Sequence, residues 1–390
     1  MTIGLRNGLL TLALVAAPFA CFSADTQPLR YNMSILVPLA DPPATGPFPP
    51  LGYPLYGSAA ALNNSGVVVG ETFDLRKPRA RATIWGESRT PSSVGDLSQF
   101  GEFAGSSAVA INDNGTVVLN VSYEGFVVVE RGVSTAYLGA SANTLNSAGV
   151  IGGYSHATRQ AAIWTGAVQR DLPSLGGTSS QVASLNSAGT AVGSSSLIGD
   201  PTYQCMPWEG GAPCVVAHAT AWTPDGNILD LGTLGGAASW ATSINELGQV
   251  IGAIRYERSQ VAHAFVWENG LMTDLGAGTA LDMNNVGVVV GSMPAEYGNP
   301  LATIWIDGRA TNLNSLLASP ALADDWHIYS AAAVNDAGQI AASAYSKLDG
   351  RYVAVLLTPV DEPPIMLLMA FGLTGHVWLA RRKKDAVRAH

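Results

Sequence analysis

The densest group of acidic, aromatic and imidazole side chains in the sequence is ADDWH, residues 323–327. Paired carboxylates such as Asp324 and Asp325 can act as general acid and base on a glycosidic bond. The stretch has the place of the first strand of a repeated unit, however, and neighbouring residues of a strand point to opposite faces. We therefore expect the two carboxylates not to converge, and the sequence assigns no catalytic residue.

Two histidines also have side chains suited to catalysis or metal binding. His218 and His263 each lie four positions before a tryptophan, whereas the corresponding positions before three other tryptophans hold Arg81, Gln160 and Leu301. A catalytic histidine would not be replaced by leucine while the unit itself persists. We interpret both histidines as polar strand residues that bond to a neighbouring unit, and we predict no metal site and no cofactor.

A third candidate is the insertion SLIGDPTYQCMPWEGGAPC, residues 196–214. Long loops on rigid scaffolds commonly carry binding sites. The rings of Tyr203 and Trp208 could stack on a sugar, and Glu209 could accept hydrogen bonds from its hydroxyl groups. A loop that binds nothing is the alternative.

The same insertion contains two cysteines, Cys205 and Cys214. An exported chain meets an oxidising compartment, which predicts a disulfide between them. The alternative is a zinc site, which would need two more ligands, and only His218 is near in sequence.

These side chains are set in a chain of repeated units. The sharpest mark of a unit is Asn-x-x-Gly, which occurs seven times at intervals of 34 to 59 residues. Asn opens a turn because its side chain can bond the backbone two residues on, and Gly takes the positive φ that a tight hairpin needs. The seven pairs are Asn63 and Gly66, Asn112 and Gly115, Asn146 and Gly149, Asn186 and Gly189, Asn245 and Gly248, Asn284 and Gly287, and Asn335 and Gly338.

A second mark is a strand with tryptophan at a fixed place, then a turn and another strand, as in HAFVWENGLMTDLG (residues 263–276). Four short strands in about 45 residues are typical of propeller blades. We predict an all-β fold, a β-propeller of about seven four-stranded blades over residues 25–359. A β-helix or a solenoid of hairpins is the alternative, although those folds favour shorter and more even periods. The tryptophans are Trp85, Trp164, Trp222, Trp267 and Trp305.

The last unit has only three strands before residue 360, while residues 31–39 form a strand without a unit. We expect this N-terminal strand to be the outer strand of the last blade, with Ile35 hydrogen-bonded near residues 353–356. A ring closed in this way has no long open edge.

Both ends have the composition of targeting segments. Residues 1–24 contain one cation, Arg6, and an apolar run, which predicts a secretory signal peptide; a lipoprotein held through Cys21 is the alternative. Residues 364–380 are apolar and precede the basic tail 381–390, which predicts a transmembrane helix with a cytoplasmic end.

The charge of the body restricts its partners. Without Arg6 and the residues from 361 onward, 14 Lys and Arg remain against 26 Asp and Glu, a net charge of −12. An acidic body argues against nucleic acid and against anionic lipid surfaces as partners.

The repeated units resemble the HAF family of probable extracellular repeats, named for a His-Ala-Phe such as residues 263–265. Residues 360–390 resemble a PEP-CTERM sorting tail: Glu362 and Pro363 match its short motif, whereas Asp361 stands where the family usually has proline. The resemblance implies secretion, an exosortase-type sorting protease as partner, and a Gram-negative cell that makes exopolysaccharide. It implies no activity for the repeats.

We therefore predict an exported, non-enzymatic binding or structural module with a polysaccharide as its first candidate ligand. We expect it at the inner membrane in the periplasm, or sorted to the outer surface or the extracellular matrix. A propeller glycosidase or polysaccharide lyase is the alternative function. Three or more acids converging on one axial face would favour the enzyme, and an acid-free axial funnel would favour the binding module.

Overall fold

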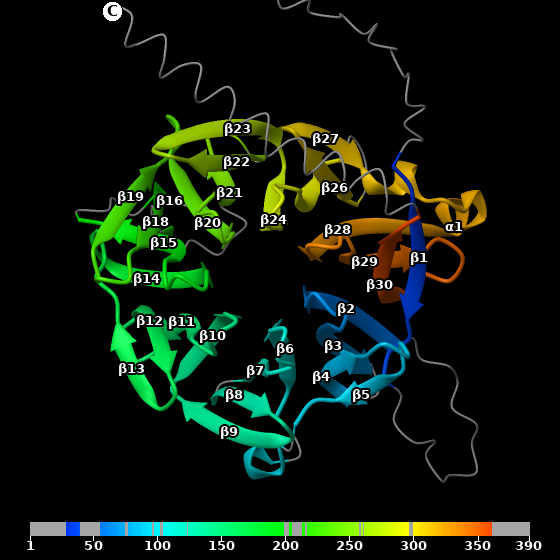
Figure 1. The fold of residues 1–390 in the computed structure, drawn as a ribbon, viewed down its shortest axis with the longest axis horizontal. Helices are drawn as coiled ribbons and strands as arrows, with labels where there is room; N and C mark the ends of the chain where they lie inside the picture. Colours follow the sequence, from blue (N-terminus) through cyan, green and yellow to red (C-terminus); the bar gives the residue numbers. More distant parts are fainter. Residues whose placement is uncertain are drawn as a thin grey trace, which may run out of the picture.

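The computed structural model describes residues 29–39, 55–74, 77–95, 97–101, 104–122, 124–198, 203–204, 213–214, 217–256, 259, 261–295 and 299–360. Seven four-stranded antiparallel sheets stand around a common axis as the blades of a propeller (Figure 1). The predicted all-β propeller of about seven blades is confirmed, and the alternative β-helix or solenoid is wrong.

Each blade runs from an inner strand beside the axis to an outer strand at the rim (Figure 1). Blade 1 contains β2 (Leu55–Leu62), β3 (Val68–Asp74), β4 (Lys77–Trp85) and β5 (Pro91–Ser93); blade 2 contains β6 (Ser106–Ile111), β7 (Val117–Val121), β8 (Gly125–Glu130) and β9 (Val133–Leu138); blade 3 contains β10 (Ala140–Leu145), β11 (Ile151–Ser155), β12 (Gln160–Thr165) and β13 (Val168–Asp171); blade 4 contains β14 (Gly176–Leu185), β15 (Ala191–Leu197), β18 (Ala217–Trp222) and β19 (Ile228–Gly232).

Blade 5 contains β20 (Ala238–Ile244), β21 (Val250–Arg255), β22 (Ala262–Glu268) and β23 (Leu271–Ala277); blade 6 contains β24 (Thr279–Met283), β25 (Val289–Met293), β26 (Leu301–Ile306) and β27 (Arg309–Asn312); blade 7 contains β28 (Trp326–Val334), β29 (Ile340–Ser346), β30 (Tyr352–Pro359) and β1 (Tyr31–Leu36). The short pieces outside the blades are β16 (Tyr203–Gln204), β17 (Pro213–Cys214), the 3-10 helices η1 (Ser98–Phe100) and η3 (Leu313–Leu316), and α1 (Pro320–Asp325).

The Asn-x-x-Gly mark forms the turn between the first and second strands of every blade. In blade 5 the side-chain oxygen of Asn245 accepts the N–H of Gln249 at 3.0 Å, and the N–H of Gly248 donates to the Asn245 carbonyl at 3.1 Å. Gly248 has φ of 81°, and the seven glycines of the mark lie between 74° and 84°. The predicted turn chemistry is confirmed.

A repeated bulge shapes the inner strands. In blade 5 the register shifts between Ala241 and Ser243, and the other six inner strands shift at the corresponding place. The bulge brings the carbonyl of Trp240 against Gly252 of the second strand, where an added Cβ would overlap that oxygen. The glycine that ends each VVVG run, Gly70 or Gly291, has the same position as Gly252 and meets the same close backbone approach.

The N-terminal strand closes the ring. Strand β1 pairs with β30 in antiparallel register from Tyr31 opposite Pro359 to Leu36 opposite Ala354, and Ile35 lies opposite Val355. The indole N–H of Trp85 donates to the carbonyl of Val37, just beyond β1, at 2.8 Å. Trp222 bonds Pro173, just beyond the outer strand of blade 3, in the same way at 2.7 Å. The predicted closure is confirmed.

The core lies between the blades, where side chains of adjacent sheets interdigitate. Four of the predicted tryptophans are buried: Trp85, Trp164, Trp222 and Trp305 are at most 3% exposed. Trp267 is only partly buried, and in its blade the fully buried ring is that of Phe265. Trp267 lies opposite Val250 just as Trp164 lies opposite Ile151, so the fixed place of the tryptophan is confirmed, although in blade 5 the aromatic ring two residues earlier fills the core.

The stretch ADDWH is not a single strand. Ser319 accepts the N–H of Leu322 on its side chain and Pro320 follows, which is a favourable helix start. Asp324 and Asp325 therefore end α1, and β28 begins at Trp326. The prediction of a strand over the two carboxylates is wrong, because the cap and the proline of the preceding residues begin a helix.

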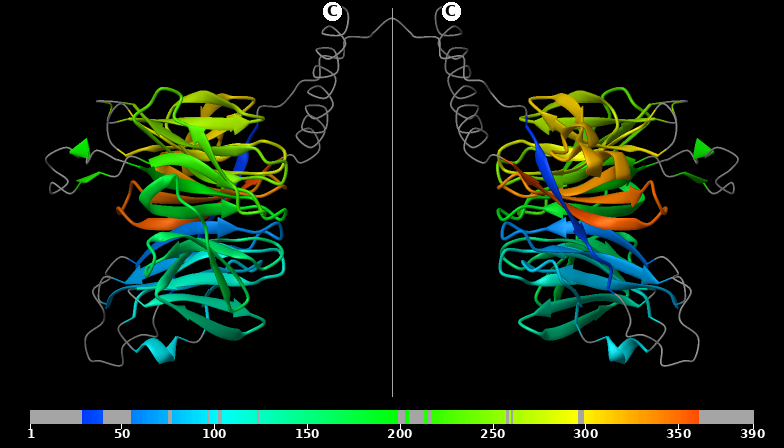
Figure 2. Two further views of the ribbon diagram at one scale, coloured as in Figure 1. Left: turned by 90° about the vertical axis from the view of Figure 1, so that its left-hand side faces the viewer. Right: turned by 90° about the vertical axis from the view of Figure 1, so that its right-hand side faces the viewer.

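The two faces of the disc differ. We call the face with the seven Asn-x-x-Gly turns the turn face, and the opposite face, where the second strand of each blade leads to the third, the loop face. Strand β30 runs toward the turn face, since Leu357 pairs with Ile340 just after the turn of blade 7. The β16–β17 hairpin belongs to the loop face, on the same side as the β29–β30 connection (Figure 2).

Candidate functional site

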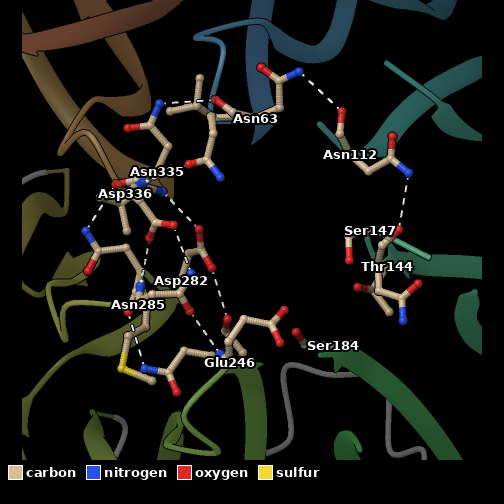
Figure 3. Close-up of a pocket in the computed structure, with 18 of the residues that line it drawn as sticks. Asn63, Asn112, Thr144, Ser147, Ser184, Glu246, Asp282, Asn285, Asn335 and Asp336 are labelled. Carbon is tan, nitrogen blue, oxygen red and sulfur yellow. Dashed lines mark hydrogen bonds between the residues drawn. The ribbon is translucent and has the colours of Figure 1, made fainter. Parts of the chain in front are cut away.

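A closed ring of seven asparagines surrounds the propeller axis, and Figure 3 shows the part of it at Asn335, Asn63 and Asn112. The side-chain amide of each Asn in the repeated mark donates to the backbone carbonyl of the corresponding Asn in the next blade, at 3.0–3.3 Å. All seven are at most 6% exposed. The ring runs from Asn63 to Asn112, Asn146, Asn186, Asn245, Asn284 and Asn335, and back to Asn63.

Each asparagine therefore has two tasks. Its side-chain oxygen holds the turn of its own blade, and its side-chain N–H₂ holds the next blade. A buried amide that lost either partner would leave a polar group unsatisfied, which costs more than the net gain from forming the bond. The sequence predicted the first task only.

A second layer of bonds joins the residues that follow the asparagines. Asp113 accepts both the backbone N–H and the side-chain amide of Asn64, at 2.8 and 2.9 Å. Asp336 accepts the same two groups from Asn285, at 2.9 Å each. Glu246 accepts the backbone N–H of Ser187 at 3.1 Å and its hydroxyl. Carboxylates of this layer are thus bound to the preceding blade.

The ring encloses a cavity of about 240 Å³ to which all seven blades contribute (Figure 3). Its walls carry amides, hydroxyls, carboxylates and aliphatic groups, and no basic or aromatic side chain is among the described residues that line it. The residue that follows the bulge of the inner strand is polar on one side of the axis. Four consecutive blades place Thr144, Ser184, Ser243 and Asp282 there, and the other three have Ala61, Ala110 and Ala333.

Asp282 connects three blades. Its two oxygens accept the hydroxyl of Ser243 in blade 5 at 3.0 Å and the backbone N–H of Val334 in blade 7 at 2.9 Å. Burial raises the pKa of Asp282 to about 6, in spite of these hydrogen bonds, and the negative charge of Asp336 acts in the same direction. The carboxyl therefore changes charge near neutral pH.

The acids at the axis answer the question that the sequence left open only in part. Asp113, Glu246, Asp282 and Asp336 all line the cavity, so the funnel is not acid-free, as a binding module would have it, and more than the three acids named for an enzyme lie there. Each of them is nevertheless engaged by donors from a neighbouring blade. Carboxylates fixed in this way connect blades, and a substrate would have to displace those donors to reach them.

The two candidate histidines pair within their own blades. His263 donates from Nδ1 to Asp274 on the next strand at 2.8 Å, and His218 donates to Asp230 at 2.8 Å. Burial alone would raise the pKa of Asp274, but the N–H of Gly276 and the bond from His263 hold it below its usual value. The expected bond to a neighbouring unit is wrong, because the third and fourth strands of one blade already place the acid beside the imidazole.

The other predicted site residues are only partly described. Tyr203 and Cys214 lie opposite each other in the β16–β17 hairpin. Trp208, Glu209 and Cys205 lie outside the described residues, so the insertion site and the disulfide stay predictions. The signal peptide, Glu362 and Pro363, and the apolar segment 364–380 also lie outside them.

Within the described residues, no helix is both long and apolar enough to cross a membrane. Over the same part of the chain, no three His, Cys, Asp or Glu side chains are grouped to hold a metal ion.

Three serines connect adjacent blades by hydrogen bonds that the sequence did not predict. Ser106, Ser180 and Ser239 stand near the start of their inner strands, and each accepts a backbone N–H from the third strand of the preceding blade at 2.8–3.0 Å. All three are at most 6% exposed. Their signal was a serine six residues before the asparagine of the mark.

No protein-family model matches the chain, and no curated protein matches it in sequence. Among solved structures, the crystal structure of a triple arginine-to-alanine mutant of AofleA from Arthrobotrys oligospora is similar to it, with 11% identity and a TM-score of 0.35. That similarity covers 80% of this chain and 88% of the other. The description of this chain as a propeller rests on its own strand pairing.

Proposed function

We propose that this chain is an exported, non-enzymatic binding module of the cell envelope and that its ligand is a polysaccharide. The observation that carries the proposal is the state of the axial cavity. Its four carboxylates accept hydrogen bonds from donors of adjacent blades. The ring of amides and acids therefore cross-links the blades and makes the propeller a rigid scaffold. Rigid scaffolds present their binding groups on the connecting loops.

The positions of the two ends support a binding role for the loop face. The N–H of Val360, the last described residue, donates to the carbonyl of Arg30 at 3.0 Å, so the two ends leave the propeller side by side. Both lie at the turn face, beside the Asn-x-x-Gly turn of blade 7. A tether through the segment that follows would direct the turn face to the membrane and leave the loop face open to ligand.

The cellular location of the protein and the processing of its two ends are part of the proposal. We infer a cleaved signal peptide at residues 1–24, a membrane helix at 364–380, and sorting by an exosortase-type protease that reads Glu362 and Pro363, as the HAF-like repeats and the PEP-CTERM-like layout suggest. Alkaline phosphatase fused after Pro359 should be active, and the same enzyme fused after His390 should be inactive. Activity in both fusions would contradict a membrane-spanning tail.

The experiment that tests the function measures binding and hydrolysis together. The full-length chain, purified in mild detergent, is screened against immobilised neutral and acidic polysaccharides while released reducing ends are assayed. We expect retention on at least one neutral polysaccharide and no release of reducing ends. A chain that binds none of the polysaccharides refutes the proposal.

A glycosidase or lyase is the second candidate function, because a carboxyl with a pKa of about 6 lies in a cavity with three further acids. Such a pKa suits a general acid at neutral pH. If the wild type releases reducing or unsaturated ends and Asp282→Asn does not, the enzyme replaces the binding module. Equal binding by both proteins without release supports the binding module.

A further inference from the structure

Five aromatic rings form a contiguous cluster where blade 7 meets blade 1. We call Tyr56, His327, Tyr329, Tyr345 and Tyr352 the tyrosine cluster. Tyr352 lies at its centre, with ring centroids 5.6 Å from Tyr56, 5.8 Å from Tyr329 and 6.0 Å from Tyr345. His327 adds a contact to Tyr345 at 5.1 Å. Strand β2, which carries Tyr56, lies directly beside blade 7 (Figure 1).

The strand register explains why these rings meet. His327 of β28 lies opposite Tyr345 of β29, which in turn lies opposite Tyr352 of β30. Three rings therefore stand side by side across three neighbouring strands. Tyr56 approaches the row from the inner strand of blade 1, so the cluster spans the seam between the last and the first blade.

The repeat itself does not require these rings. In blade 5 the corresponding row across β20, β21 and β22 is Ala238, Arg255 and Ala262. A blade of the same propeller thus forms without an aromatic residue in this row. The aromatics of blade 7 are an addition to the architecture.

The cluster is open to solvent on the loop face. These residues lie at the ends of their strands away from the Asn-x-x-Gly turn, beside the hairpin that joins β29 to β30. Tyr352 is 38% exposed, and the other four rings are half-buried. Burial raises the pKa of Tyr329, so its hydroxyl stays protonated and can donate a hydrogen bond. The cluster thus offers one accessible ring held by partly buried neighbours.

We propose that the tyrosine cluster is a binding site for a neutral pyranose ring of a polysaccharide chain, with Tyr352 as the stacking platform. The proposal rests on the proposed function and names its site. The apolar C–H face of a pyranose packs on an aromatic ring, and phenol hydroxyls can donate to and accept from sugar hydroxyls. The charged groups of the adjoining hairpin are already engaged: Arg351 pairs with Asp349 at 2.6 Å, and the Lys347 ammonium donates to the carbonyl of Ala323 at 2.8 Å. Recognition of a ligand is thus left to the aromatic rings and their hydroxyls.

The test is titration calorimetry of the full-length chain in mild detergent against neutral hexasaccharides: cellohexaose, laminarihexaose, mannohexaose and xylohexaose. Tyr352→Ala should weaken the affinity for the bound sugar by about tenfold or more, as truncation of a central aromatic anchor commonly does. Tyr352→Leu keeps an apolar side chain but has no aromatic ring, so it should weaken the affinity similarly. It serves as the test variant if the alanine variant does not fold. Tyr154→Ala, which removes a partly buried tyrosine of blade 3 outside the cluster, should bind like the wild type.

The outcomes separate this site from the function as a whole. If the wild type binds a hexasaccharide and Tyr352→Leu binds it equally well, the tyrosine cluster is not the site and the binding function stands. Thr144→Val then tests the axial cavity as the place of binding. If the wild type binds no hexasaccharide, the proposed function fails and the site fails with it. The wild type could instead bind tetramethylammonium or hexaproline and no sugar. If Tyr352→Leu then lost that binding, the tyrosine cluster would be a site for such a ligand, and the proposal of a saccharide site would be wrong.

Discussion

The side-chain amide of Asn335 donates to the backbone carbonyl of Asn63 at 3.1 Å, across 272 residues of sequence. This bond completes the inner ring of amides, and the N–H of Asp336 bonds the side-chain oxygen of Asn64 at 3.0 Å beside it. The propeller is therefore closed twice, by the amide ring at the axis and by β1 at the rim.

Removal of one amide from the ring should destabilise the whole propeller. Asn186→Ala removes the buried bond to the Asn245 carbonyl and the partly buried bond from the Thr190 N–H. We expect a loss of about 2 kcal/mol of unfolding free energy, since a buried carbonyl and a partly buried N–H lose their partners. Urea denaturation measures the change, and the exposed Asn227→Ala should shift the midpoint little. Equal midpoints for both variants would show that the ring adds no stability.

Two tryptophans of the repeat should differ in their contribution. Trp222 is 1% exposed and bonds Pro173 through its indole, whereas Trp267 is partly exposed. Trp222→Ala should cost about 3–5 kcal/mol through the cavity that it leaves. Trp267→Ala should cost about 1–2 kcal/mol, because less apolar area returns to water. Thermal melting of both variants tests the difference, and a larger loss at Trp267 would contradict the packing described for blade 5.

Stability should decrease as the pH rises through the range in which Asp282 loses its proton. Its pKa is about 6 in the folded chain against an ordinary value of 3.8, so the folded state keeps a proton that the unfolded state has lost. Between these values stability falls with rising pH, and above pH 6 a constant penalty on the order of 3 kcal/mol remains.

Asp282→Asn tests this penalty. The amide can accept from the Val334 N–H and donate to the Ser243 hydroxyl, so both bonds persist without the charge. We expect the variant to be more stable than the wild type at pH 7 and equally stable at pH 4. A variant that is less stable at pH 7 would mean that the ionised carboxylate stabilises the blades.

Deletion of the closing strand should make the protein aggregate. Without residues 29–39 the edge of β30 is open, and the indole of Trp85 loses its acceptor at Val37. An open edge strand pairs with other chains. Size-exclusion chromatography with light scattering should show large species for this deletion and none for a deletion of residues 1–28, which keeps β1. A monomeric 29–39 deletion would mean that the amide ring alone closes the propeller.

The repeated marks were sufficient to predict the architecture from the sequence. Asn245 and Gly248 predicted their turn because the chemistry of a tight turn is local to four residues. The pairing of Ile35 with Val355 followed from counting strands per unit.

Relations between blades could not be predicted in this way. That the amide of Asn245 reaches the carbonyl of Asn284 depends on the angle between blades, which no spacing in the sequence records. The expectation for His263 was wrong because its partner, Asp274, belongs to the next strand of the same blade. The meeting of Tyr56 with Tyr352 requires the ring to close before the two residues are neighbours.

The position of β1 also determines the order in which the strands of the last blade can pair. Its residues leave the ribosome before any blade exists, yet their partner β30 is almost the last strand to be synthesised. The nascent chain must therefore keep an apolar strand unpaired through the assembly of six blades, and contacts between such distant segments form slowly. Maturation of this propeller thus depends on an interval in which its first strand is without its partner, and whatever shields that strand meanwhile determines the yield of closed rings.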